Sequence, residues 1–314
     1  MSAFTDALEA GDLVALRRIP KADLHIHGIG GGDRDFLRER TGVDIAPVEG
    51  IFHSMAEMHA FSDRRLAPVF VGAEGRALAL EATFVQARKD GVTRIEVGTD
   101  AWDITLHGGS AASVWNSLRA AQLTAAPDIG WIPQLGISRH CPIPAIERWI
   151  APLLDLDVFK TFDLSGDEST QPIEAFIPIY RRAKAAGLRL KAHVGEWGTA
   201  DEVWRAVEAL ELDEVQHGIA AADSPQVMRA LADAGIRLNV CPTSNLRLGR
   251  VSSLQEHPIR ALFDAGVRVT VNTDDPLIFG CTLSGEFVAL YNAGVMTAAE
   301  LDAIRLEALQ DPAD

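Results

Sequence analysis

The sequence has few cysteines, no long apolar run and no cluster of basic residues, and each absence excludes a class of protein. Its three cysteines, Cys141, Cys241 and Cys281, lie far apart, which favours free thiols in a reducing compartment over a disulfide framework. No apolar stretch approaches the roughly 18 residues of a membrane-spanning helix, and the acidic N-terminal segment does not resemble a secretion signal. We therefore expect a cytoplasmic protein that does not bind membranes.

The charge of the chain is strongly one-sided. Lysines and arginines number 29 against 44 aspartates and glutamates, which gives a formal net charge of −15. Such a chain repels phosphate backbones and anionic lipids, so nucleic acid is also not expected as a partner. Apolar residues make up 47% of the 314 residues, enough to bury one large core. Since no linker-like segment divides the chain, we expect a single domain over residues 1–314, with its oligomeric state left open.

Short β-rich segments alternate with helical segments along the chain. The expected strands lie at 22–27, 92–98, 129–137, 158–164, 188–194, 213–217, 236–241 and 267–273. Helical segments lie between them at 74–91, 110–126, 172–187, 201–212 and 224–235. This alternation predicts parallel strands with crossover helices, and eight such units predict a (β/α)8 TIM barrel. An open dinucleotide-binding sheet is disfavoured, because the glycines at 28–32 lack the required spacing.

The polar residues best suited to chemistry lie at the C-terminal ends of these expected strands, where barrel enzymes place their active sites. They are His25, His27, His193, Glu196, His217, Asp274 and Asp275. His25 and His27 are two residues apart, so in a strand they face the same side. Imidazoles combined with a carboxylate are typical of a catalytic zinc site, and bound zinc activates water for hydrolysis. We therefore predict a zinc-dependent hydrolase.

Six motifs make a more specific prediction when they are taken together and in order. They are PKADLHIH (20–27), DLSGDES (163–169), HVGE (193–196), QHG (216–218), CPTSN (241–245) and NTDDP (272–276). With these motifs the chain resembles the adenosine deaminase family of metal-dependent amidohydrolases from about residue 20 to 295. The resemblance implies hydrolytic deamination of a small purine-like substrate, such as adenosine, adenine or an N6-substituted adenine compound, with release of ammonia.

The resemblance also implies roles for individual residues. Four residues would bind one zinc ion (Zn2+) per chain: His25, His27, His193 and Asp274. Glu196 would donate a proton to the ring nitrogen beside the attacked carbon, and His217 would orient and deprotonate the attacking water. Asp275 and the backbone of Gly166 would contact the purine.

One position departs from the family pattern, and it bears on the choice of substrate. Where the family has an acid that binds the ribose 5′-hydroxyl, this chain has Ile29, and Asp33 could replace that acid only through a rearranged loop. The identity of the purine therefore stays open, although the net charge favours a base or nucleoside over a nucleotide. Segment 51–71 is expected to supply extra helices that cap the C-terminal face of the barrel as a lid.

Two other functions remain as alternatives. One is an amidohydrolase that cleaves an amide, an ester or a ring C–N bond. Such enzymes usually carry a metal-bridging carboxylated lysine on the fourth strand, where Lys160 lies too early. The other is a catalytically silent metal- or ligand-binding homologue, which would be expected to lack Glu196 or His217, yet both residues are present.

Overall fold

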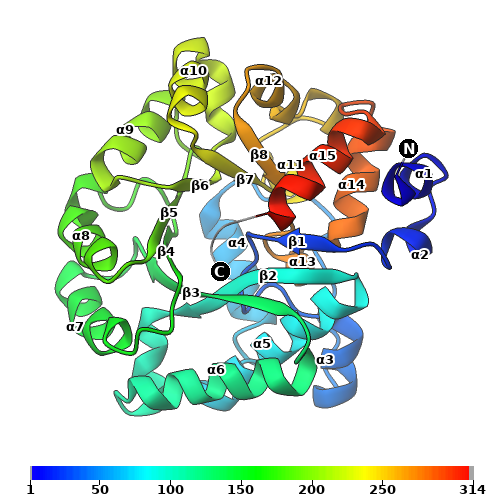
Figure 1. Ribbon diagram of the computed structural model, residues 1–314. Coiled ribbons are helices and arrows are strands. Elements are labelled where there is room, and N and C mark those ends of the chain that lie inside the picture. The colour runs from blue at the N-terminus through cyan, green and yellow to red at the C-terminus, as the bar shows by residue number, and fades with distance from the viewer. Residues whose placement is uncertain (1, 311–314) are drawn as a thin grey trace.

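The computed structural model describes residues 2–310 and confirms the predicted (β/α)8 barrel. Eight parallel strands pair in chain order from β1 to β8, and Figure 1 shows them as a ring with helices outside it. The strands are β1 Lys21–Asp23, β2 Val92–Asp100, β3 Gly130–Ser138, β4 Thr161–Ser165, β5 Arg189–Val194, β6 Glu214–His217, β7 Arg237–Val240 and β8 Arg268–Val271. Seven of the eight overlap the predicted ranges to within three residues at each end.

The helices outside the barrel include one in each of the five predicted segments and three more that the sequence analysis did not assign. They are α5 Gly72–Lys89, α6 Ala111–Ala125, α7 Ile143–Leu154, α8 Ile177–Ala185, α9 Ala200–Leu210, α10 Pro225–Ala234, α12 Ile259–Asp264 and α14 Leu283–Asn292. The helix expected at 172–187 is divided into a 3-10 turn, η2 Ile173–Phe176, and α8. Helix α15, Ala298–Leu309, packs against β1 and β8, and Figure 1 shows it in red near the opening between them.

Nine further helices and 3-10 turns lie within the described residues. They are α1 Ala3–Glu9, α2 Leu13–Leu16, α3 Arg34–Thr41, α4 Met55–Arg65, α11 Pro242–Arg247, α13 Pro276–Phe279, η1 Ala101–His107, η3 Ile219–Asp223 and η4 Leu254–Glu256. Within residues 2–310, none of the helices combines the length and the apolar character that crossing a membrane requires.

The barrel closes differently from the prediction at its first strand. The strand expected at 22–27 ends at Asp23. Beyond that point Ile26 forms a single bridge to Asp274, and the side chain of Asn272 accepts a backbone N–H bond of 2.8 Å. The sequence prediction of a longer strand was wrong because side-chain bonding replaces part of the ladder here. As a result, the two histidines that follow β1 lie beside the segment that follows β8.

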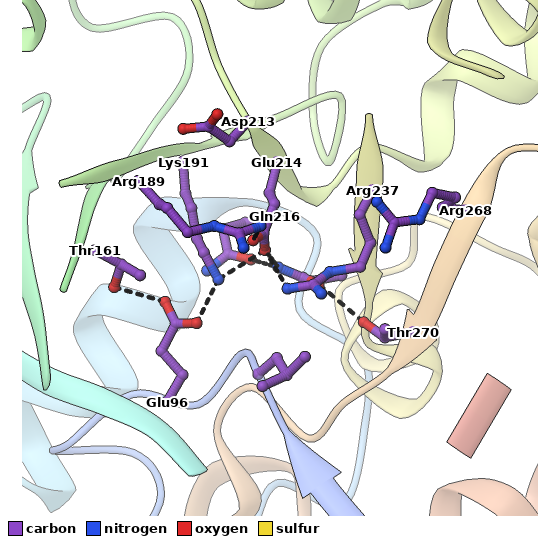
Figure 2. A network of polar contacts seen from close by, with 12 residues as sticks. Glu96, Thr161, Arg189, Lys191, Asp213, Glu214, Gln216, Arg237, Arg268 and Thr270 are labelled. Atoms are coloured by element: carbon purple, nitrogen blue, oxygen red, sulfur yellow. Dashed lines mark hydrogen bonds and ion pairs between the residues drawn. The ribbon is translucent and has the colours of Figure 1, made fainter. Parts of the chain in front are cut away.

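The interior of the barrel contains buried ion pairs in addition to branched apolar side chains. Lys191 on β5 lies 2.5 Å from a carboxylate oxygen of Glu96 on β2 and 2.7 Å from one of Glu214 on β6. Arg237 on β7 lies 2.6 Å from Glu214, and Figure 2 shows the connected network. All four side chains are at most 1% exposed. The network therefore joins opposite sides of the barrel through buried charge.

The predicted helical cover over the C-terminal face is confirmed. Helix α4 lies within the expected segment 51–71, and Met55 and Met58 border the same cavity as the predicted site residues. Met58 and Phe61 pack against a second apolar cluster, separate from the main core, that includes Leu66 and Phe279. No residue of α4 is fully buried, so this helix packs against the barrel through only one half-buried face.

Candidate active site

The residues predicted as metal ligands converge at the C-terminal end of the barrel. His25 and His27 follow β1, His193 lies on β5, and Asp274 follows β8. His27 Nε2 lies 3.1 Å from Asp274 Oδ1 and 3.3 Å from His193 Nε2. His25 Nε2 lies 3.3 Å from the same Asp274 oxygen. Ligands at the usual zinc distances in a tetrahedron are about 3.3 Å apart, so these spacings fit one small cation.

Buried polar atoms that lack hydrogen bonds indicate the same position. His25 is 1% exposed, and neither of its ring nitrogens forms a hydrogen bond with good geometry. Burial lowers the pKa of His25 to about 4, so its ring is neutral, which is the form that binds a metal. Asp274 Oδ1 is also buried without a hydrogen bond. A cation would satisfy these groups, so the residues present fit the metal that the sequence predicts.

His217 lies at the edge of the same cluster. Its side chain can be grouped geometrically with His25, His193 and Asp274 as a potential metal site. Its Nε2 atom, however, is 4.0 Å from Asp274 Oδ2 and 3.5 Å from Glu196 Oε1. These distances exceed those that join the four predicted ligands, and they place His217 beside the metal position and next to Glu196.

The protonation of Glu196 and His217 suits an acid and a base. Burial, followed by the charge of Asp274, raises the pKa of Glu196 well above its ordinary value. Burial, followed by the closeness of the His25 ring, lowers the pKa of His217 well below its ordinary value. These two directions favour a protonated carboxyl group on Glu196 and a neutral imidazole on His217, the forms in which they can act as acid and base.

Three side chains orient two of the predicted ligands and His217, although the sequence analysis assigned them no role. Asp163 Oδ2 lies 3.0 Å from His193 Nδ1. Ser244 donates a 2.6 Å hydrogen bond to Asp274, and the Asn245 side chain lies 3.3 Å from His217 Nδ1. Partners of this kind fix the tautomer and the orientation of metal ligands. Their signal was their position in the DLSGDES and CPTSN motifs, of which the first begins within β4 and the second directly follows β7.

Glu168 holds the loop that carries Glu196. Its two carboxylate oxygens accept backbone N–H bonds from Gly195 at 2.8 Å, Glu196 at 3.0 Å and Trp197 at 2.8 Å. Arg250 supports the same loop, since it donates a 2.8 Å bond to the Glu196 carbonyl and stacks on Trp197. The backbone of the loop is therefore fixed from both sides, and the sequence analysis missed both contacts.

The cavity next to these groups has a volume of about 410 Å³, within the range of small-molecule sites. Asp275 and Gly166 both border it, as a purine-contacting role would require. Burial and then Asp274 raise the pKa of Asp275 to about 7. Gly30 makes room for this carboxyl group, because an added Cβ would lie only 1.6 Å from Asp275 Oδ1. The glycine-rich segment thus lets the backbone pass close to the site.

Asp33 does not replace the acid that is missing at position 29. Its carboxylate caps α3 by accepting a 2.8 Å bond from the Phe36 N–H and forms a 2.8 Å ion pair with Lys89. Asp33 is absent from the cavity lining, whereas Ile29 borders the cavity and packs against the second apolar cluster. The rearranged loop considered from the sequence is therefore not observed.

Comparison with known proteins identifies the family. The family model for adenosine deaminase matches residues 74–312. A putative adenosine/adenine deaminase of Treponema pallidum is 34% identical over 288 residues, covering 92% of this chain and 96% of the relative. An adenine deaminase of Acinetobacter baylyi is 30% identical, with 94% and 92% covered. The crystal structure of an adenine deaminase from Arthrobacter aurescens superposes with a TM-score of 0.79 at 26% identity, covering 92% of this chain and 93% of that one. These matches confirm the expectation of a deaminase drawn from the motifs, and the chain belongs to the adenosine deaminase family.

Proposed function

We propose that this protein is a zinc-dependent enzyme that hydrolytically deaminates an adenine-type base or nucleoside. The observation that carries the proposal is the convergence of four potential metal ligands with one buried acid, Glu196, and one buried base, His217, beside a single cavity. The family match and the deaminase relatives support the same reaction.

His25, His27, His193 and Asp274 would hold the metal. Nitrogen ligands combined with one carboxylate suit zinc better than magnesium or calcium, which prefer oxygen ligands. When bound, such an ion supplies an acidified water molecule as the nucleophile. Asp163 and Ser244 keep two of the ligands oriented.

The protein's own acid and base would move the protons of the reaction. Neutral His217 accepts the proton that the attacking water loses, and protonated Glu196 donates one to the ring nitrogen beside the amine-bearing carbon. A C–O bond forms at that carbon, and the proton held by His217 passes to the exocyclic amine. The C–N bond then breaks, the amine leaves as ammonia, and the proton of the new hydroxyl group returns to Glu196. Asp275 and the backbone of Gly166, which both border the cavity, would hold the ring in place.

The proposal is tested by measuring ammonia release together with metal content. Zinc-loaded protein should bind about one equivalent of zinc and release ammonia from at least one of adenine, adenosine and deoxyadenosine, or the alkylamine from an N6-alkyl adenine. Glu196→Gln should retain zinc but lose turnover, whereas Glu208→Gln, at an exposed position of α9, should change neither property. Release of neither ammonia nor alkylamine from any of these compounds would instead favour an amidohydrolase that cleaves another bond.

We also propose a cytoplasmic, single-domain enzyme. One continuous apolar cluster includes residues from Phe4 to Ile304, which supports one domain over residues 1–314. The three cysteines are free, as expected for a reducing compartment. Limited proteolysis should therefore yield no separately stable half of the chain.

A further inference from the structure

A glutamate lies on the apolar face of helix α14, and the proposed chemistry does not use it. Residues three or four positions apart on a helix share one face, and in α14 one such face contains Leu283, Glu286, Phe287 and Leu290. The three apolar members belong to the main core, and Glu286 among them is 1% exposed. Burying a carboxyl group is unfavourable unless it is hydrogen-bonded, so the partner of Glu286 identifies the contact that offsets this cost.

The partner lies in the segment that follows β7. Glu286 Oε2 accepts a 3.0 Å hydrogen bond from the backbone N–H of Thr243, the second residue of α11. Cys241, the residue before this helix, provides no side-chain cap, and Pro242 at its first position has no N–H group. Since α14 packs against α11, Glu286 supplies the missing cap from a position 43 residues later in the chain.

Helix α11 carries two buried side chains that orient groups of the proposed active site. Ser244 donates a 2.6 Å hydrogen bond to Asp274 Oδ2. Asn245 follows it in the sequence, and its side-chain amide lies 3.3 Å from His217 Nδ1. The helix therefore connects its cap with a potential metal ligand and with the proposed base.

Glu286 is not among the described residues that line the cavity, so it does not itself meet the substrate. We propose, building on the proposed function, that Glu286 is a positioning residue that holds the N-terminus of α11. In this position the helix keeps Ser244 bonded to Asp274, and it keeps Asn245 beside His217. Glu286 thus acts through two other side chains, on the affinity of the metal site and on the orientation of the base.

The test measures zinc affinity together with the kinetics of ammonia release. The kinetics use zinc-saturated protein and whichever of adenine, adenosine and deoxyadenosine the unmodified protein deaminates. Glu286→Met removes the acceptor, so the Kd for zinc should rise by about 10- to 100-fold and kcat should fall by a similar factor, the usual effect of losing a group that orients metal ligands. KM should stay within about threefold, because the substrate contacts are unchanged.

Two further variants separate the hydrogen bond from the change of residue. Glu286→Gln keeps an oxygen that can accept the Thr243 N–H bond, and it should therefore retain zinc affinity and kcat to within about threefold. Glu208→Met makes the same substitution at an exposed position of α9 and should change neither quantity.

A double variant tests the route from Glu286 to the metal site. Ser244→Ala removes the bond to Asp274 directly and should weaken zinc binding by itself. Because Glu286 acts on the metal site through Ser244, adding Glu286→Met to Ser244→Ala should weaken zinc binding by less than about threefold more. A full additional loss would overturn the inference, and so would a Glu286→Met protein that differs from the unmodified protein only in its Tm.

If Glu286→Met does not fold, Glu286→Asp takes its place, since it keeps a carboxyl group but draws it back from Thr243. Unchanged zinc affinity and kcat in that variant would overturn the inference. The proposed function is judged separately. A protein that binds zinc but deaminates none of the three compounds would contradict the proposed function, and its zinc affinities would still decide the role of Glu286.

Discussion

At the residue scale, the position of Glu196, the proposed acid, depends on a carboxylate that does not border the cavity, that of Glu168. Glu168 accepts backbone bonds from four consecutive residues, 195–198, and so fixes the loop that presents Glu196. Replacing one carboxylate oxygen with an amide group turns an acceptor into a donor that faces N–H groups. We regard Glu168 as a positioning residue, because it acts through Glu196.

Glu168→Gln should therefore lower kcat by about 10- to 100-fold, the cost of misaligning one proton donor, with zinc content and KM little changed. The pH at which activity declines should also move, because the pKa of Glu196 depends on its surroundings. Glu174→Gln is a suitable control, since Glu174 forms an exposed ion pair with Arg205. An unchanged kcat and pH profile would show that the loop keeps its position without Glu168.

The residues that could be predicted from the sequence are those whose type and spacing carry chemistry. His25, His27, His193 and Asp274 stand out in this way, and the structure brings all four together. Glu168 lay within a recognised motif, but its bonds go to backbone N–H groups of another loop. Contacts of that kind depend on the fold and leave no pattern in the sequence.

At the scale of the elements, the interior charges of the barrel were beyond sequence prediction. Glu96, Lys191 and Glu214 lie on different strands, and charged residues in a strand ordinarily indicate a solvent-facing side. In the structure these side chains point into the barrel, where Lys191 forms ion pairs with both glutamates, as Figure 2 shows. Burial alone would raise the pKa of Glu214, but the charges of Lys191 and Arg237 outweigh burial and hold it well below its ordinary value.

Removing the shared cation should destabilise the protein strongly. Lys191→Met leaves Glu96 and Glu214 buried with less compensation, and breaking a buried pair in this way costs about 3–5 kcal/mol. Urea unfolding of the zinc-loaded protein, followed by tryptophan fluorescence, measures this loss. Lys184→Met, which removes the exposed pair with Glu211, should leave the unfolding midpoint unchanged. Equal midpoints for both variants would mean that solvent reaches the interior network.

At the scale of the whole molecule, metal binding should be coupled to folding. The ligands come from three separate parts of the chain, near residues 26, 193 and 274, so the unfolded protein cannot assemble the site. A ligand that binds only the folded state, at about 1,000 times its Kd, adds about 4 kcal/mol of stability. Removing zinc with a chelator should lower the Tm by several degrees, and adding zinc back should restore both Tm and ammonia release. A Tm that does not respond to the chelator would argue against a metal at this position.

The pH dependence of overall stability offers a second test, at Glu286 on α14. This side chain is 1% exposed and accepts a 3.0 Å bond from the Thr243 N–H. Burial raises its pKa from 4.5 to about 7. Below about pH 4.5 the group is protonated in both the folded and the unfolded state, so its contribution does not vary there. Between about pH 4.5 and 7 the unfolded chain releases the proton while the folded chain retains it, so stability falls as the pH rises.

Glu286→Gln should remove this dependence, since glutamine keeps an acceptor for Thr243 but never ionises. Relative to the unmodified protein, the variant should gain about 3 kcal/mol in free energy of unfolding between pH 4.5 and 7.5, an order-of-magnitude value for the full shift. Urea unfolding at several pH values measures this difference directly, with Glu208→Gln as the exposed control. If the pKa of Glu286 is raised, the pH-dependent contribution of this residue is absent at low pH. The plots of unfolding free energy against pH for the two proteins should then converge at low pH and separate at high pH. Parallel curves would mean that Glu286 is ionised in the folded protein throughout this range.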